Sequence, residues 1–201
     1  MAELTKFEQW WLNAWPHRLH IRRRVPRFLK SCPEPFRGQV LEVGAGAGWT
    51  SQRILETFPQ VELTATDIDP QVHEQFKRLQ GKYGQRLKFA QADILELPFD
   101  RNSFDIVLAV HVIHHLEDVT RGLQQLLRVL RPGGLLGILD ADQQYSEGIA
   151  RWLWRSRTAI NRSVLEGILR AEDCQLRVSV GNHRYTLWAQ KAYPISSAAL
   201  G

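Results

Sequence analysis

The feature that most constrains this chain is a glycine-rich loop in the stretch VLEVGAGAG, residues 40–48. The loop joins an apolar run with the composition of a buried strand to a helical segment that begins near Trp49. Glycine at positions 44, 46 and 48 permits positive φ angles and lets a ligand approach the backbone where a Cβ would clash. Loops of this kind bind nucleotide-like ligands at the carboxyl ends of parallel strands. The stretch therefore predicts an α/β fold with a ligand site at this loop.

The rest of the chain continues the alternation of strands and helices. Five β-rich apolar runs are separated by segments of helical length, which is the pattern of βαβ units in a parallel sheet. The clearest helix is 119–130, where apolar residues recur with the helical period, and R-P-G-G at 131–134 is expected to end it. Two further runs around a Gly-Asn turn predict a terminal β-hairpin. The predicted strands are 39–44, 61–67, 86–93, 104–110 and 134–140, followed by hairpin strands at 174–180 and 184–193.

The length of 201 residues suits a single domain with one continuous core. Helices are predicted within residues 3–30, and Pro16 and Pro26 are expected to break them because proline removes a backbone donor. A second helical stretch, of one helix or two, is predicted within 149–172. The predicted organisation over 1–201 is an N-terminal helical lid (1–38), a ligand-binding core (39–140), a second helical lid (141–172) and a terminal hairpin (173–193).

Residues around the glycine loop indicate the kind of ligand. Trp49 stands where a dinucleotide-binding loop has its third small residue, and no Lys-Ser/Thr pair follows, so a phosphate-binding loop is disfavoured. Glu42, near the end of the first strand, would repel a phosphate and suits a ligand with a cation or hydroxyl groups. Asp67, at the end of the second strand, is placed to accept hydrogen bonds from both hydroxyls of a ribose. Asp93, after the third strand, is a candidate acceptor for an adenine amino group.

These residues resemble the motifs of the class I S-adenosylmethionine-dependent methyltransferases, in particular the group that acts on small molecules. The motifs occur in the order of that family: LEVGAGAG, TATDID, QADILELPF, FDIVLAVHVIHHL and LLRVLRPGGLLGILD. They span residues 39–140, and five ordered motifs make the resemblance specific. The resemblance implies a Rossmann-like three-layer sandwich, with a seven-stranded, mostly parallel sheet whose last strand is antiparallel. It also implies S-adenosylmethionine as the cofactor.

The resemblance implies roles for individual residues as well. The glycine loop would line the methionine part of the cofactor, Asp67 would hold the ribose and Ile68 would pack on the adenine. Asp93 and Ile94 would flank the polar edge of the adenine. Glu42 would anchor the loop or meet the ammonium group of the cofactor through water. The implied cofactor-binding residues are Glu42, Gly44, Ala45, Gly46, Gly48, Asp67, Ile68, Asp93, Ile94 and His111.

Methyl transfer from a sulfonium is an in-line displacement, to which proximity and alignment contribute most of the rate. A general base helps where the acceptor is a hydroxyl or an acidic carbon. His111, just after the fourth strand, is the catalytic candidate, and His114 and His115 are alternatives for which a structural role is favoured. No acidic residue accompanies these histidines at the spacing of a metal site, so no metal is expected.

Tryptophan and positive charge gather at the two ends of the chain. Residues 1–39 hold 8 basic and 3 acidic side chains and residues 144–201 hold 8 and 4, whereas residues 40–143 hold 10 and 14. Trp11, Trp15 and Trp152 are predicted substrate-lid residues of an apolar acceptor pocket. The alternatives are that the ends lie on a membrane surface, that they bind nucleic acid, or that the tryptophans are core residues beneath a solvated arginine face.

The predicted function is therefore methyl transfer to O, N or C of a small or amphiphilic acceptor, with the basic ends favouring an anionic one. No N/D-P-P-Y/F motif follows the fourth strand, which disfavours nucleic acid as the partner. The alternatives are a non-catalytic S-adenosylmethionine-binding module and a methyltransferase that acts on RNA or protein. Cys32 and Cys174 match no disulfide framework or zinc spacing, and no apolar run is long enough to cross a bilayer. A cytoplasmic location, with peripheral membrane contact, is expected.

Overall fold

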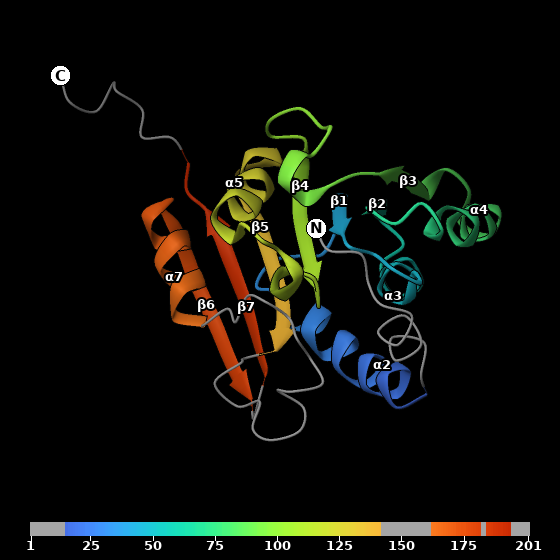
Figure 1. The fold of residues 1–201 in the computed structure, drawn as a ribbon, viewed down its shortest axis with the longest axis horizontal. Coiled ribbons are helices and arrows are strands. Elements are labelled where there is room, and N and C mark those ends of the chain that lie inside the picture. The colour runs from blue at the N-terminus through green and yellow to red at the C-terminus, as the bar shows by residue number, and fades with distance from the viewer. Residues whose placement is uncertain (1–14, 142–161, 182–183, 194–201) are drawn as a thin grey trace.

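A seven-stranded sheet runs through the middle of the molecule, with the strand order β3-β2-β1-β4-β5-β7-β6 (Figure 1). The computed structural model describes residues 15–141, 162–181 and 184–193. Neighbouring strands are parallel from β3 to β5, whereas β7 is antiparallel to both β5 and β6. This arrangement confirms the predicted sheet with its antiparallel last strand. The strands are β1 (Gly38–Val43), β2 (Val61–Asp67), β3 (Leu87–Gln91), β4 (Phe104–Val110), β5 (Leu130–Ala141), β6 (Cys174–Gly181) and β7 (Arg184–Lys191).

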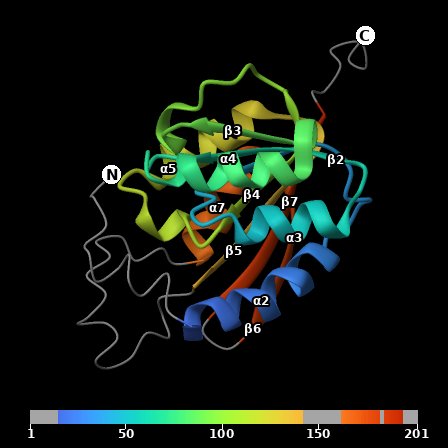
Figure 2. The ribbon, with the colours of Figure 1, turned by 90° about the vertical axis from the view of Figure 1, so that its right-hand side faces the viewer.

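Helices cover both faces of the sheet and complete the three predicted layers (Figures 1 and 2). Each face buries its own hydrophobic cluster, and β1 and β4 contribute to both because successive side chains of a strand point to opposite faces. The carboxyl ends of the parallel strands meet at one edge, where α/β sheets bind ligands. One face packs against α2 (Trp15–Lys30), α3 (Trp49–Thr57) and α4 (Val72–Tyr83), and the other against α5 (Val119–Val129) and α7 (Arg162–Ala171). The short 3-10 helices are η1 (Gly84–Arg86), η2 (Ile94–Glu96) and η3 (Ile113–His115).

Helix α2 continues through Pro26, so the predicted break at that residue is wrong. A proline inside a helix removes one backbone hydrogen bond, but the neighbouring side chain of Phe28 is buried against the sheet. Its ring stacks on Trp188 of β7 with the centroids 4.8 Å apart, and Trp188 Nε1 donates to Ser31 Oγ at 3.0 Å. This packing compensates for the lost bond, and it makes the second half of α2 a part of the core.

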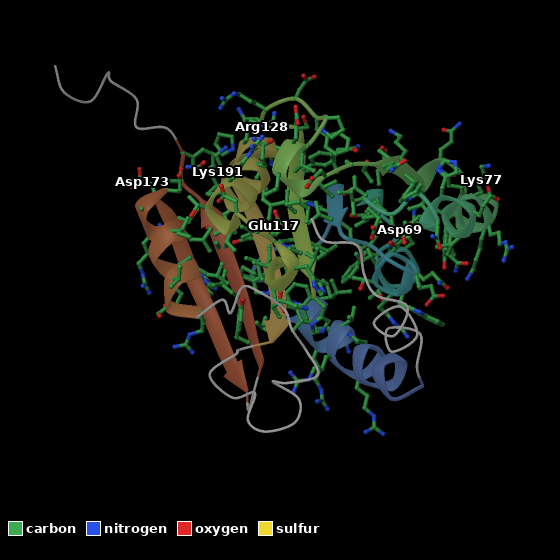
Figure 3. The ribbon with its side chains drawn as sticks, in the orientation of Figure 1. Asp69, Lys77, Glu117, Arg128, Asp173 and Lys191 are labelled. Carbon is green, nitrogen blue, oxygen red and sulfur yellow. The ribbon has the colours of Figure 1, made fainter. Side chains whose placement is uncertain are left out.

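The junction between α5 and β5 contains the R-P-G-G motif, residues 131–134. Helix α5 ends at Val129, one residue before the predicted end, and β5 already begins at Leu130, so the motif lies inside the strand. The register between β4 and β5 shifts across it, which is a local bulge. Lys191 of β7 (Figure 3) closes this corner by donating from Nζ to the carbonyl oxygens of Leu127 and Leu130, at 2.8 and 2.7 Å.

The two cysteines are free thiols, and burial raises the pKa of both. Cys174 begins β6 opposite Lys191, where its pKa is raised to about 11. A thiol that is protonated at neutral pH is a poor nucleophile and a poor metal ligand. No helix in the described ranges is both long and apolar enough to span a membrane.

Candidate cofactor and catalytic site

The glycine loop leaves the carboxyl end of β1 with three positive φ angles. They are +64° at Gly44, +49° at Gly46 and +73° at Gly48, in a region that L-residues rarely adopt. A Cβ at Gly44 would collide with Val112, and one at Gly48 would collide with Leu79. A Cβ at Gly46 would meet no atom within 4 Å. The loop is therefore packed tightly at its two ends and faces open space at its centre.

Glu42 lies beneath this loop and is 2% exposed. Ser51, in the first turn of α3, donates from Oγ to Glu42 Oε2. Burial raises the pKa of Glu42 to about 8; the charge of Asp67 adds to this, while hydrogen bonds from Ser51 and Thr50 oppose it. At neutral pH the side chain is thus mostly protonated and presents no charge to a ligand. This placement favours the anchoring role for Glu42 over a contact with a cationic ligand.

Asp67 ends β2 beside the loop, as its position in the sequence predicts. Its Oδ2 accepts from the amide of Gly46 at 2.7 Å, and its Oδ1 accepts from the amide of Asp69 at 3.0 Å. The amide of Ala45, another predicted cofactor residue, donates to the carbonyl oxygen of Thr66 at 2.9 Å. A carboxylate has about four acceptor positions. Two of them hold the backbone, which leaves acceptor capacity for the two hydroxyls of a ribose.

The residues predicted around the adenine take different positions. Ile68 follows Asp67 and is half-buried. Asp93 caps η2, because its Oδ1 accepts from the amide of Leu95 at 2.9 Å. Ile94 is 4% exposed and packs in the core on the α5 side of the sheet. Burial of this side chain leaves only the backbone of Ile94 to meet an adenine. The contacts of Ile68 and Asp93 with the adenine stay predictions.

Two histidines that follow β4 lie near a buried carboxylate at the end of β5, and a third histidine stacks on one of them. Asp140, near the end of β5, is 1% exposed. Its Oδ1 lies 2.6 Å from Nδ1 of His114 in η3 and 3.9 Å from Nδ1 of His111. The ring of His115 lies on that of His114, with the centroids 3.9 Å apart. The structure therefore brings the predicted histidines together with an acidic partner that sequence reasoning missed.

His111 itself has a φ of +55°, which is uncommon for a residue other than glycine. Its amide donates to the carbonyl oxygen of Leu139 at 2.8 Å, which ties the end of β4 to β5. The signal that could have identified Asp140 is the one that identified Asp67, an acidic residue at the carboxyl end of a parallel strand.

The residues at this edge fit S-adenosylmethionine. Gly46 leaves open space at the centre of the loop, and Asp67 offers acceptors for a ribose beside the half-buried Ile68.

Of the predicted lid residues, Trp15 is the first residue of α2, whereas Trp11 and Trp152 lie outside the described residues. Within the described ranges no three His, Cys, Asp or Glu side chains are grouped to hold a metal ion.

Known proteins resemble part of this chain. A family model for the methyltransferase domain matches residues 41–138. A demethylmenaquinone methyltransferase of Deinococcus radiodurans is 34% identical over 102 residues, which cover 51% of this chain and 42% of that protein. A phthiotriol/phenolphthiotriol dimycocerosates methyltransferase of Mycobacterium tuberculosis is 34% identical over 139 residues, which cover 65% of this chain and 50% of that protein. The chain spans about half the length of these curated relatives.

The fold has counterparts among solved structures. The crystal structure of a SAM-dependent methyltransferase from Aquifex aeolicus matches with a TM-score of 0.65 at 19% identity, over 84% of this chain and 88% of that chain. At that identity the likeness concerns the fold alone. The family assignment rests on the matched domain together with the glycine loop and Asp67. Residues 41–138 therefore match the methyltransferase domain, the fold is shared with an S-adenosylmethionine-dependent methyltransferase, and family model and fold together imply S-adenosylmethionine as the cofactor.

Proposed function

We propose that this chain methylates a hydroxyl oxygen or an acidic carbon of a small or amphiphilic acceptor, with His114 as the general base. The hydrogen bond between His114 and the buried carboxylate of Asp140 carries this proposal. S-adenosylmethionine supplies an electrophilic methyl group when bound. The chain's own residues then need to align the acceptor and remove its proton.

Asp140 fixes the tautomer of His114. When Asp140 is ionised, its carboxylate only accepts hydrogen bonds, and the ring proton of His114 then belongs on Nδ1 across the 2.6 Å contact. Nε2 then carries the lone pair that can take a proton from the acceptor. After proton transfer, the buried carboxylate stabilises the imidazolium. The His114 side chain is 16% exposed, so the ring is not sealed inside the core.

His111 is placed differently from His114. Its Nδ1 lies 3.9 Å from the same carboxylate oxygen, which is too long for a hydrogen bond. The Nδ1 atom of His114, at 2.6 Å, lies nearer to this oxygen than that of His111 does. The geometry favours His114 over His111 as the base. That His111 lies near the methionine end of the cofactor stays a prediction.

A dedicated base narrows the class of acceptor. An amine already carries the lone pair that attacks a methyl group, whereas a hydroxyl or a carbon acid must lose a proton. The two relatives are named for demethylmenaquinone and for phthiotriol dimycocerosates, and neither acceptor is a nucleic acid or a protein. Both considerations support a small or amphiphilic acceptor that is methylated at oxygen or carbon.

The test measures transfer of a labelled methyl group to demethylmenaquinone and to a panel of phenols and carbon acids. His114→Gln should lower kcat by about 10²–10⁴, because the rate loses its general base. Asp140→Asn should also lower kcat, because an amide can donate to Nδ1 and leave the wrong ring nitrogen protonated. Both variants should bind S-adenosylhomocysteine as the wild type does.

The matched control is His73→Gln, since His73 is an exposed histidine of α4 far from β5 in the fold. It should retain wild-type kcat. Full activity of His114→Gln would show that His114 is not the general base. Cofactor binding without transfer to any acceptor, either in the panel or in a cell extract, would favour a non-catalytic S-adenosylmethionine-binding module.

A further inference from the structure

Helix α2 carries a concentration of cations without acidic neighbours along the chain. Residues 15–37 contain seven Lys or Arg residues and a single acidic residue, Glu34. Arg23, Arg27 and Lys30 are exposed, and none of them takes part in an ion pair between described residues. Figure 3 shows nitrogen-tipped side chains that extend from α2 away from the sheet. These cations are therefore available to a partner.

Strand β6 extends this surface. A shallow hollow beside the end of α2 is lined by Pro33, Trp188 of β7 and Arg177 of β6. Trp188 also stacks on Phe28 of α2, so α2, β7 and β6 form one continuous face. Arg177 is exposed on this face. We call the set Arg23, Arg27, Lys30 and Arg177 the basic surface.

Several other cations of the chain are already engaged. Arg128 donates to the carbonyl oxygens of Phe99 and Leu97 at 2.7 Å, and Lys191 holds the corner of α5 and β5. Lys77 of α4 pairs with Glu74 at 2.7 Å. All three are labelled in Figure 3. The basic surface differs from them because no hydrogen bond or ion pair between described residues explains its side chains.

We propose that the basic surface docks the chain on an anionic phospholipid bilayer. The opposite side of α2 is buried against the sheet through Val25, Phe28 and Leu29, so the cations are held as a fixed array on a rigid support. Each Lys or Arg close to an anionic membrane strengthens binding about fivefold. Four such residues are enough for a reversible, salt-sensitive attachment without a lipid anchor or an inserted helix.

Single-stranded nucleic acid fits this surface less well. Such ligands combine phosphate contacts with stacking of bases on exposed aromatic rings. In the described part of the chain, the large exposed hydrophobic side chains are Val164 of α7 and Tyr193 beyond β7. Neither belongs to α2 or β6, so the basic surface has no described platform for base stacking.

Delivery of an amphiphilic acceptor from the bilayer would rest on the proposed function, whereas docking itself does not.

The test is co-sedimentation of the full chain with vesicles of phosphatidylglycerol and phosphatidylcholine at about 0.05 M salt, where charges are weakly screened. The wild type should bind these vesicles and should not bind pure phosphatidylcholine. The triple variant Arg23→Gln, Arg27→Gln, Lys30→Gln should bind about a hundredfold more weakly, since three cations each contribute about fivefold. Raising the salt to about 0.5 M should release the wild type.

The matched control removes three exposed cations from α4 and β3, with the substitutions Lys77→Gln, Arg78→Gln and Lys88→Gln. It should bind like the wild type, and both triple variants should unfold at the wild-type urea concentration. If both triple variants lost vesicle binding equally, binding would depend only on net charge, and the proposal would be overturned. Failure of the wild type to bind anionic vesicles would also overturn it.

Tighter binding to a single-stranded RNA oligomer than to the anionic vesicles, at about 0.15 M salt, would reassign the surface to nucleic acid. None of these measurements requires cofactor or methyl transfer. Failure of the docking surface is therefore distinguishable from failure of the proposed function.

Discussion

Replacing Glu42 by glutamine should make the free energy of unfolding less dependent on pH. Burial raises the pKa of Glu42 from 4.5 to about 8 in the folded chain. Between these two values the folded chain holds a proton that the unfolded chain releases, so this group's contribution to stability is lost as the pH rises. Glutamine keeps an acceptor for Ser51 and cannot ionise, so the variant has no such loss.

The magnitude follows from the two pKa values. A carboxyl group whose pKa moves from 4.5 to about 8 on folding loses on the order of 3 to 4 kcal/mol of stabilisation between pH 5 and pH 8. The stability of the variant relative to the wild type should therefore rise by about that amount over the same interval. An effect of this size is a large fraction of the 5–15 kcal/mol that stabilises a typical domain.

The assay is urea unfolding of both proteins at about pH 5 and about pH 8, with the free energies obtained by linear extrapolation. Glu62→Gln is the matched control, because Glu62 is an exposed glutamate of β2 that accepts a hydrogen bond from Gln39. Its difference from the wild type should be the same at both pH values. A constant difference between Glu42→Gln and the wild type would mean that the pKa of Glu42 is not raised by folding.

Two further predictions concern the glycine loop and helix α2. Gly46→Ala should cost about 1–2 kcal/mol of stability from its positive φ, and calorimetry should show S-adenosylhomocysteine binding at least about tenfold more weakly, because the new Cβ enters the open space of the loop. Gly44→Ala should instead lower the melting temperature more strongly, because its Cβ would collide with Val112. Phe28→Ala should lower the free energy of urea unfolding by about 3–5 kcal/mol, since Phe28 is 2% exposed; an unchanged value would mean that α2 is a separate lid.

Local patterns were enough to predict the sheet and its loop. The strands are short apolar runs, which are typical of buried strands. Positive φ at Gly44, Gly46 and Gly48 is what a tight strand-to-helix turn requires. Asp67 was recognisable because the carboxyl end of the second strand must lie beside the loop that ends the first. These features depend on residues close in sequence or on the rule that parallel strands end at one edge.

The pairing of His114 with Asp140 depends on a contact between distant parts of the chain. The two residues are 26 positions apart and meet because β5 lies directly beside β4. Local sequence patterns do not show which strands are neighbours in the sheet. The histidine motif could therefore be recognised while its partner Asp140 was not. The path of α2 through Pro26 is similar, because burial of Phe28 against Trp188 overrides a local rule about proline.

The orientation of Glu42 gives a third reason why part of the site could not be predicted from the sequence. A carboxyl group near a strand end beside a glycine loop suggests a contact with the ligand. The side chain shares a face of β1 with Val40, however, and that face is covered by α3. Because alternate side chains of a strand point to the same face, burial of Glu42 follows only once the position of α3 is known.

Cofactor binding at this edge of the sheet is measured by a calorimetric titration of the wild type and of Asp67→Ala with S-adenosylhomocysteine. We expect one binding site in the wild type. We expect at least about tenfold weaker binding in the variant, because each lost hydrogen bond to a charged acceptor is worth about 1.5–3 kcal/mol. Equal affinity in the two proteins would contradict the assignment of Asp67 to the ribose. Absence of binding to the wild type would show that this edge of the sheet does not bind S-adenosylmethionine.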